Sequence, residues 1–338
     1  MLMREASRRQ RMTSLVTGSA AWLCTLLLWG CSGPKHEPLR FAALGAQFAT
    51  APAIVAVREK IFQVKGVEVG SFDMTAGVFA KDSVVNGNAD VAVVANTPLA
   101  LSAAKGEDIV VLARIMYSDK MHALVSRSAN PVDAQPIAYV PGTSSEFFLR
   151  SVLDKAAPAA PTFSSLKLVQ LRPPGIVPAF NSDSVATVSM WEPFVSDLSR
   201  SKSPPYAPIE GVTVNKYPGL YPFAFYIVTS RAAWGRRSHD ILLFLDALRT
   251  ACHEINADSS AARSQMETLF GYPKGWLEPL WADFDFHFNT DVKDLRPPIE
   301  NDAKLAVESG VIKRRPDIGP LFALLPEINR ALHVTLSQ

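Results

Sequence analysis

A continuous apolar run, Val91 to Ala95, is the feature that most constrains how this chain can fold. Asn86-Gly87 precedes the run and Asn96-Thr97-Pro98 follows it, and both are typical boundary signals. A short run rich in valine, with no alternating polar residues, is typical of a strand that is buried on both faces. Such a strand belongs in a largely parallel sheet covered by helices. The run therefore predicts an α/β fold.

Strand-like and helix-like segments alternate on both sides of this run. The first block has strands expected at 39–44, 67–72, 91–95 and 109–115, with helices at 52–66, 77–85 and 99–105 between them. The second has strands expected at 137–140, 166–171 and 185–190, with helices at 145–155 and 175–180. This order predicts two α/β lobes. Residues 121–125 are interpreted as a strand running between the lobes, the return crossing is expected near 212–226, and a helical pattern begins at Ser238.

The N-terminus has the order of an export signal. Four arginines (Arg4, Arg8, Arg9 and Arg11) precede an apolar stretch from Leu15 to Trp29, which ends at Gly30-Cys31. The apolar part is short for a membrane span of about 20 residues. We interpret 1–30 as a lipoprotein signal peptide, Cys31 as its lipidation site and 31–38 as a polar tether. The alternative is an ordinary signal peptide, or a short anchor, with a chance cysteine.

Charge and cysteine content exclude several function classes. With a formal net charge of +2, the chain lacks the excess of basic residues that is typical of a nucleic-acid-binding protein. Once Cys24 has left with the signal and Cys31 carries lipid, only Cys252 remains, so neither an internal disulfide nor a cysteine metal cluster is expected. The sequence has no Walker loop, no dinucleotide-binding glycine motif, no zinc-protease motif and no nucleophile elbow. We therefore expect no catalytic residues, no metal and no cofactor.

Polar and aromatic residues follow several predicted strands, where open α/β sheets bind ligands. Gly142-Thr143-Ser144-Ser145 lies where a strand ends and a helix begins, and Asn96-Thr97-Pro98 repeats this arrangement. Free N–H groups at such a helix start can hold an anionic group, although a hydroxyl there can also be a simple helix cap. Trp191-Glu192-Pro193 offers an indole wall and an acceptor. The predicted ligand-binding residues are Thr97, Tyr117, Ser144, Ser145, Trp191 and Glu192.

The order of three segments resembles a known family. These segments are 86–94 with Asn96-Thr97-Pro98 after it, 139–149, and Met190-Trp191-Glu192-Pro193-Phe194. Behind a lipobox-like signal, they resemble the solute-binding proteins of ABC importers, in the nitrate, sulfonate and taurine group and the pyrimidine-precursor group. The likeness runs from about Phe41 to Ala233. The family's usual Gly-x-Asp-x-Ala segment is replaced here by residues 181–187, and the loop 45–50 is also atypical.

The resemblance implies a two-lobed periplasmic-binding-protein fold, type II-like, with a helical C-terminal extension. We expect lobe 1 to comprise 39–125 and 213–338, and lobe 2 to comprise 126–212. The implied function is delivery of a small polar or anionic solute, sulfonate-like or pyrimidine-precursor-like, to an ABC permease. The protein would be a periplasmic, lipid-anchored monomer that is not an enzyme. Two alternatives stay open: a lipid-anchored ligand sensor, and an enzyme of the pyrimidine-synthase type.

Overall fold

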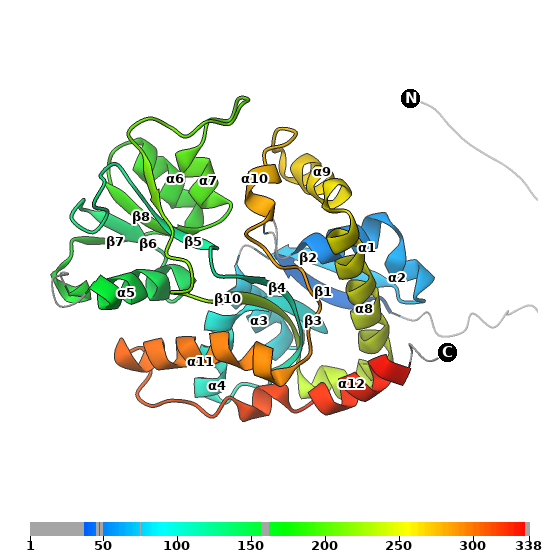
Figure 1. The fold of residues 1–338 in the computed structure, drawn as a ribbon. Helices are drawn as coiled ribbons and strands as arrows, with labels where there is room; N and C mark the ends of the chain where they lie inside the picture. Colours follow the sequence, from blue (N-terminus) through cyan, green and yellow to red (C-terminus); the bar gives the residue numbers. More distant parts are fainter. Residues whose placement is uncertain (1–36, 45–46, 48–49, 75, 157–161, 335–338) are drawn as a thin grey trace, which may run out of the picture. The chain divides into compact units, whose positions relative to one another are not determined.

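Two separate five-stranded sheets form the framework of the computed structural model (Figure 1). The structure describes residues 37–44, 47, 50–74, 76–156 and 162–334. The first sheet has the order β2-β1-β3-β10-β4, with β1 (Leu39–Leu44), β2 (Val69–Met74), β3 (Val91–Ala95), β4 (Val110–Ser118) and β10 (Phe223–Thr229). The second has the order β7-β6-β8-β5-β9, with β5 (His122–Ser126), β6 (Ile137–Tyr139), β7 (Leu168–Gln170), β8 (Thr187–Trp191) and β9 (Thr213–Asn215). The expected α/β fold with two lobes is confirmed.

The apolar run Val91 to Ala95 forms β3, and every residue of this strand is buried. It lies near the centre of the first sheet, parallel to β1 on one side and antiparallel to β10 on the other. Strand β10 also pairs antiparallel with β4, so a strand from late in the chain separates β3 from β4. The sheet is therefore mixed. The sequence suggested that β3 and β4 are neighbours, but β10 lies between them and is antiparallel to both.

Helices flank each sheet. In the first lobe these are α1 (Ala51–Arg58), α2 (Ile61–Val64), α3 (Gly77–Val85) and α4 (Asn96–Lys105), and in the second α5 (Ser144–Ala156), α6 (Pro173–Asn181) and α7 (Phe194–Ser199). The C-terminal part adds α8 (Arg231–Ala257), α9 (Ser259–Phe270), α10 (Glu278–Trp281), α11 (Val292–Glu308) and α12 (Leu325–Val334). Helix α11 contacts both α4 and α5, so the C-terminal extension touches both lobes (Figure 1).

The strand pairing shifts both expected lobe boundaries. Residues His122–Ser126 form β5, which pairs with β8 and β9 of the second sheet, whereas the predicted boundary assigned residues 122–125 to lobe 1. Strand β9, expected in lobe 1, also belongs to the second sheet. The crossings therefore lie at 119–121 and 216–222. An apolar run shows that a strand exists but does not show which sheet it joins, and that is why the boundaries differ.

Aromatic packing joins α8 to the first sheet. The Phe244 ring on α8 is stacked on the Phe62 ring, with centroids 5.3 Å apart, and lies 5.1 Å from the Phe41 ring of β1. All three side chains are buried. Removing a buried phenylalanine loses both its transfer free energy and its contacts, since the surroundings collapse only partly around the space.

We predict that Phe244→Ala lowers the free energy of unfolding by about 3–5 kcal/mol. Val64→Ala is the matched control, because Val64 is exposed and its truncation should change stability by less than about 0.5 kcal/mol. Urea denaturation followed by circular dichroism measures both. Equal stability of the two variants would contradict this account of the core.

Candidate functional site

A cavity lies between the two sheets at the carboxyl ends of their strands. Its volume is about 60 Å³. Its lining includes Leu44 and Gln47 after β1, Ala76, Gly77 and Val78 at the start of α3, Ala95, Thr97 and Pro98 around the start of α4, Gly142, Thr143 and Ser144 at the start of α5, Trp191 at the end of β8, and Phe223 and Phe225 on β10. None of these lining residues carries a charged side chain. The cavity thus combines apolar walls with three helix starts, one of them from the second lobe.

The starts of α3 and α4 leave backbone donors without partners in their own helices. The first N–H groups of any α-helix have no intrahelical acceptor. The residues preceding these helices, Ala76 and Ala95, provide no side-chain cap. Both alanines line the cavity. Unsatisfied N–H groups and the positive end of the helix dipole favour an acceptor, above all an anionic one.

The start of α5 is built differently, because a side chain caps it. Gly142 has φ +69°, a conformation that glycine adopts readily, and this turns the chain from β6 into the helix. The Thr143 hydroxyl accepts from the Ser145 N–H at 3.2 Å, and the Glu146 carboxylate accepts from the Gly142 N–H at 2.9 Å. The cap is therefore Thr143. Ser144 consequently does not have to cap the helix, and its side chain lines the cavity.

Ser144 has a buried histidine as its partner. Its Oγ lies 2.8 Å from Nε2 of His122, the first residue of β5. Burial lowers the pKa of His122 to about 3, so the ring is neutral at physiological pH. Sequence analysis placed His122 only in a strand. Its hydrogen bond to the cavity-lining Ser144 could not be recognised, because a lone histidine in an apolar strand is usually a packing residue.

Thr97 lines the cavity on the first lobe and donates its hydroxyl to a buried carboxyl group. Its Oγ1 lies 2.6 Å from Oδ2 of Asp302 on α11. The same oxygen accepts from the Tyr221 hydroxyl at 3.0 Å and from the Asn96 amide at 2.7 Å. Asp302 thereby ties the start of α4 to α11 and to the return crossing. Neither Asp302 nor Tyr221 is among the ligand-binding residues predicted from the sequence.

The environment of Asp302 favours its protonated form. Burial raises the pKa of the carboxyl group from the usual 3.8 to about 7, against hydrogen bonds from Thr97, Tyr221 and Asn96 that lower it. The second oxygen, Oδ1, is buried without a hydrogen-bond partner among the residues that the structure describes. An ionised carboxylate with one oxygen unsatisfied is costly to bury.

Trp191 and Gln47 complete the lining. The Trp191 side chain is nearly buried and lines the cavity, as expected of an indole wall. Gln47 was not predicted. Its Oε1 is buried and has no partner within the described part of the chain, so this amide oxygen can accept from a ligand or a water molecule.

Three predicted binding residues lie outside the cavity lining. The Ser145 hydroxyl is buried between strands, where it donates to the Ser189 carbonyl oxygen at 2.8 Å and accepts from the Val140 N–H at 3.0 Å. Glu192 is buried and its Oε2 accepts from the Ser196 N–H of α7 at 3.0 Å. Tyr117 lies on β4, where its N–H donates to the Asp285 carbonyl oxygen at 2.8 Å. These hydrogen bonds are all made within the protein framework.

Glu192 belongs to a group of charges at the crossings. Its Oε1 lies 3.5 Å from Nζ of Lys216, and that ammonium lies 2.8 Å from Asp283 Oδ2. Lys120, on the other crossing, lies 3.2 Å from Asp283 Oδ1. Burial raises the pKa of Glu192, while the Lys216 charge opposes that shift. Both crossings are thus held to one carboxylate of the C-terminal part.

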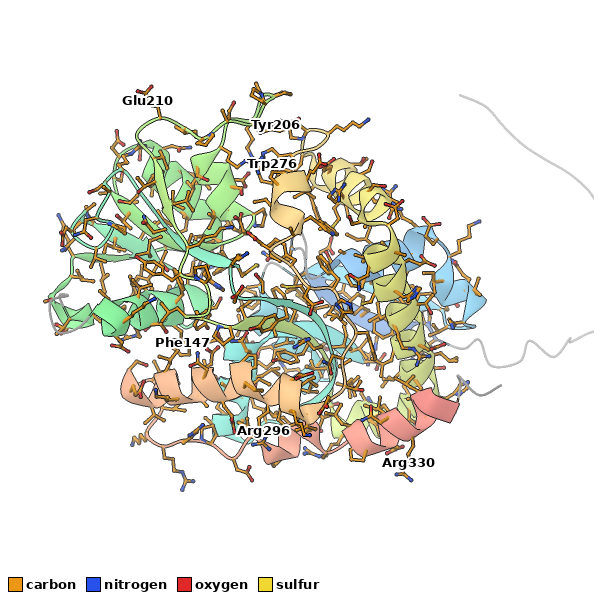
Figure 2. All side chains as sticks on the ribbon, viewed as in Figure 1. Phe147, Tyr206, Glu210, Trp276, Arg296 and Arg330 are labelled. Carbon is orange, nitrogen blue, oxygen red and sulfur yellow. The ribbon has the colours of Figure 1, made fainter. Side chains whose placement is uncertain are left out.

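The lobes also touch away from the crossings. Tyr206 of the second lobe donates its hydroxyl to the Lys274 carbonyl oxygen at 2.7 Å, and Arg200 donates to the Trp276 carbonyl oxygen at 3.2 Å. Figure 2 shows Tyr206 and Trp276 on facing loops. Hydrogen bonds therefore join the two lobes away from the crossings as well.

No helix in the described part of the chain is both long enough and apolar enough to cross a membrane.

Comparison with known proteins identifies the fold. The alkanesulfonate-binding protein SsuA from Xanthomonas axonopodis pv. citri, bound to MOPS, is 16% identical with a TM-score of 0.69, over 86% of this chain and 99% of that one. The nitrate-binding protein NrtA from Synechocystis PCC 6803 is 12% identical with a TM-score of 0.63, over 90% of each chain. A Candida albicans protein with the generic periplasmic-binding-protein fold is 15% identical with a TM-score of 0.64, over 88% of this chain and 95% of that one. The chain therefore has the periplasmic-binding-protein fold.

No protein-family model matches the sequence, and no curated protein matches it.

We predict that Asp302 makes stability fall as pH rises. Between about pH 4 and pH 7 the unfolded chain releases the Asp302 proton while the folded protein keeps it. The stabilisation is complete below the unfolded pKa and is lost as pH rises to the folded pKa, with a loss on the order of 4 kcal/mol. Asp302→Asn lacks this titration. Urea denaturation of both proteins from pH 4.5 to 8 isolates the effect, because other groups titrate equally in each. Parallel stability curves would exclude a raised pKa.

Proposed function

We propose that this protein is an extracytoplasmic solute-binding protein that delivers a small ligand to an ABC importer. The observation that carries the proposal is the cavity between two lobes, where uncapped starts of α3 and α4 face the start of α5. Contacts to both lobes give a ligand higher affinity for the closed state, which is what drives closure in a hinged protein. A permease that recognises the closed form then distinguishes loaded protein from empty protein.

The cavity chemistry suits a ligand with an acceptor or anionic end. Backbone N–H groups at the helix starts and the Ser144 hydroxyl provide donors. Among the described residues no lysine or arginine lines the cavity, so these donors and the helix dipoles supply the stabilisation of a negative charge. Trp191, Phe223 and Phe225 give an apolar wall for the rest of the ligand. A small aliphatic sulfonate meets these requirements, and so does a pyrimidine-type heterocycle that bears an acceptor group.

The structural comparisons support transport over catalysis. The similar structures include proteins described as alkanesulfonate-binding and nitrate-binding. Because their identity to this chain is low, these structures support only the fold. The ligand proposed here is therefore argued from the cavity. We propose no catalytic role, because no carboxylate of the described residues bonds to the second nitrogen of His122, and a ring with a pKa of about 3 is a poor general base.

The proposal includes a lipid anchor at the N-terminus. Cys31 and the signal segment 1–30 lie outside the described residues, so this part rests on the sequence order of arginines, apolar stretch and Gly30-Cys31. Processing at Cys31 would leave the polar segment 31–38 between the lipid and the first strand. The protein would then work at a membrane surface, as a monomer beside its permease.

We predict that Ser144→Ala and Trp191→Ala weaken ligand binding. In Ser144→Ala the loss of one hydrogen bond to a charged group should lower affinity about ten- to a hundredfold, whereas Trp191→Ala removes part of the apolar wall. Native mass spectrometry identifies ligand that copurifies, and calorimetric titration with methanesulfonate tests the sulfonate class directly. Ser182→Ala is the control, because Ser182 is exposed on the second lobe. Wild-type affinity in both cavity variants would place the binding site elsewhere.

We predict that Cys31→Ser abolishes lipidation. The variant should leave the membrane fraction or retain its signal segment, and the mass of the mature chain should lack an acyl increment. Membrane fractionation and intact mass measurement decide this. Unchanged attachment and mass in the variant would contradict the lipoprotein assignment without affecting the proposed cavity.

A further inference from the structure

His122 is buried among aromatic rings, and the one hydrogen bond of its ring among the described residues is to Ser144, which lines the cavity. The rings of Phe148, Tyr221 and Phe223 lie 5.5, 5.1 and 4.8 Å from its own. Its Nε2 lies 2.8 Å from Ser144 Oγ, whereas its Nδ1 is buried without a hydrogen-bond partner in the described chain. This asymmetry between the two ring nitrogens determines where the single proton of the neutral ring resides.

The two tautomers have different costs. A proton on Nδ1 would leave a buried N–H donor without an acceptor, which native structures rarely tolerate. A proton on Nε2 leaves only a buried lone pair at Nδ1 and provides a donor to Ser144 Oγ. Buried acceptors without partners are less rare than buried donors without partners. The lack of an acceptor at the buried Nδ1 therefore favours the Nε2–H tautomer.

We propose that His122 donates from Nε2 to Ser144 Oγ and thereby directs the Ser144 hydroxyl proton into the cavity, where it binds an acceptor group that carries no proton. Ser144 Oγ has no other hydrogen-bond partner among the described residues, so its own proton is available to a ligand. The inference rests on the proposed function and makes His122 a positioning residue. This hydrogen-bond arrangement favours an oxyanion, such as a sulfonate group, at this end of the cavity. It disfavours a ligand of similar shape that presents an N–H group to Ser144.

Two hydrogen-bond roles for Ser144 thus separate two classes of ligand. With Nε2 protonated, the Ser144 hydroxyl proton faces the cavity and adds to the open backbone donors at the starts of α3 and α4. With Nδ1 protonated, the hydroxyl would be consumed by Nε2 and its lone pairs would face the cavity. The ligand would then need a donor beside N–H groups that need an acceptor. Only the arrangement with Nε2 protonated lets one ligand group accept from Ser144 and from the open N–H groups at the starts of α3 and α4.

The tautomer can be measured without any ligand. We expect long-range ¹H–¹⁵N correlation spectra of histidine-labelled protein to show an unprotonated Nδ1 and a protonated Nε2 for His122. The His122→Gln spectrum assigns the resonances, because the chain has 6 histidines. A protonated Nδ1 overturns the proposal. If His122 were only a packing residue, there would be no reason to expect the proton on Nε2, the nitrogen that faces Ser144.

Binding of methanesulfonate tests the consequence in the intact mature protein. We expect His122→Leu to weaken binding about tenfold, because the Ser144 hydroxyl loses its fixed direction. His122→Gln should stay within about threefold of wild type, since its amide nitrogen can donate in place of Nε2. Methanesulfonamide, which carries N–H groups, should bind at least about tenfold more weakly than methanesulfonate to the wild-type protein.

A double-mutant cycle separates positioning from general damage. If His122 acts through Ser144, then His122→Leu has no further effect on binding in the Ser144→Ala background. Equal losses in both backgrounds overturn the proposal, as does unaltered binding in His122→Leu. If the wild-type protein binds no methanesulfonate, the sulfonate form of the proposed function fails, and the tautomer measurement still decides the role of His122.

Discussion

Backbone N–H groups at the starts of α3 and α4 need acceptors that their own helices cannot provide, and the cavity is built around that need. Strands β1, β3, β6 and β8 end at this place, because parallel strands bring their carboxyl ends to one edge of a sheet. Two sheets with that edge facing each other bring helix starts from both lobes together. The alanines at Ala76 and Ala95 leave the donors open where a serine or aspartate would have closed them.

The polar side chains around the cavity each depend on a residue distant in sequence. Thr97 is fixed by Asp302 and Tyr221, and Ser144 is fixed by His122. These partners come from the C-terminal helix α11 and from both ends of the crossings. The polar side chains that line the cavity are therefore linked to the segments that join the two lobes.

The sequence predicted the framework better than the site. Val91 to Ala95 indicated a strand buried on both faces, and the turn at Gly142 indicated a helix start, because both signals are local. Glu192 was predicted to be a ligand-facing acceptor, yet it accepts from the start of α7 and lies near Lys216, a residue of the return crossing. The sequence alone does not show that Lys216 is a neighbour of Glu192, because the fold brings the two residues together. His122 and Asp302 were missed for the same reason: their environments are made by contacts over long sequence separations.

The central claim is that a small acceptor-bearing ligand binds at the helix starts between the two lobes. A crystal structure of the mature protein with its copurified ligand, or with methanesulfonate, tests this most directly. The account predicts an oxyanion within hydrogen-bond distance of Ser144 and of backbone N–H groups at the starts of α3 and α4. Ligand density on the outer groove lined by Ile54, Val57 and Leu269, with the cavity between the lobes empty, would contradict it.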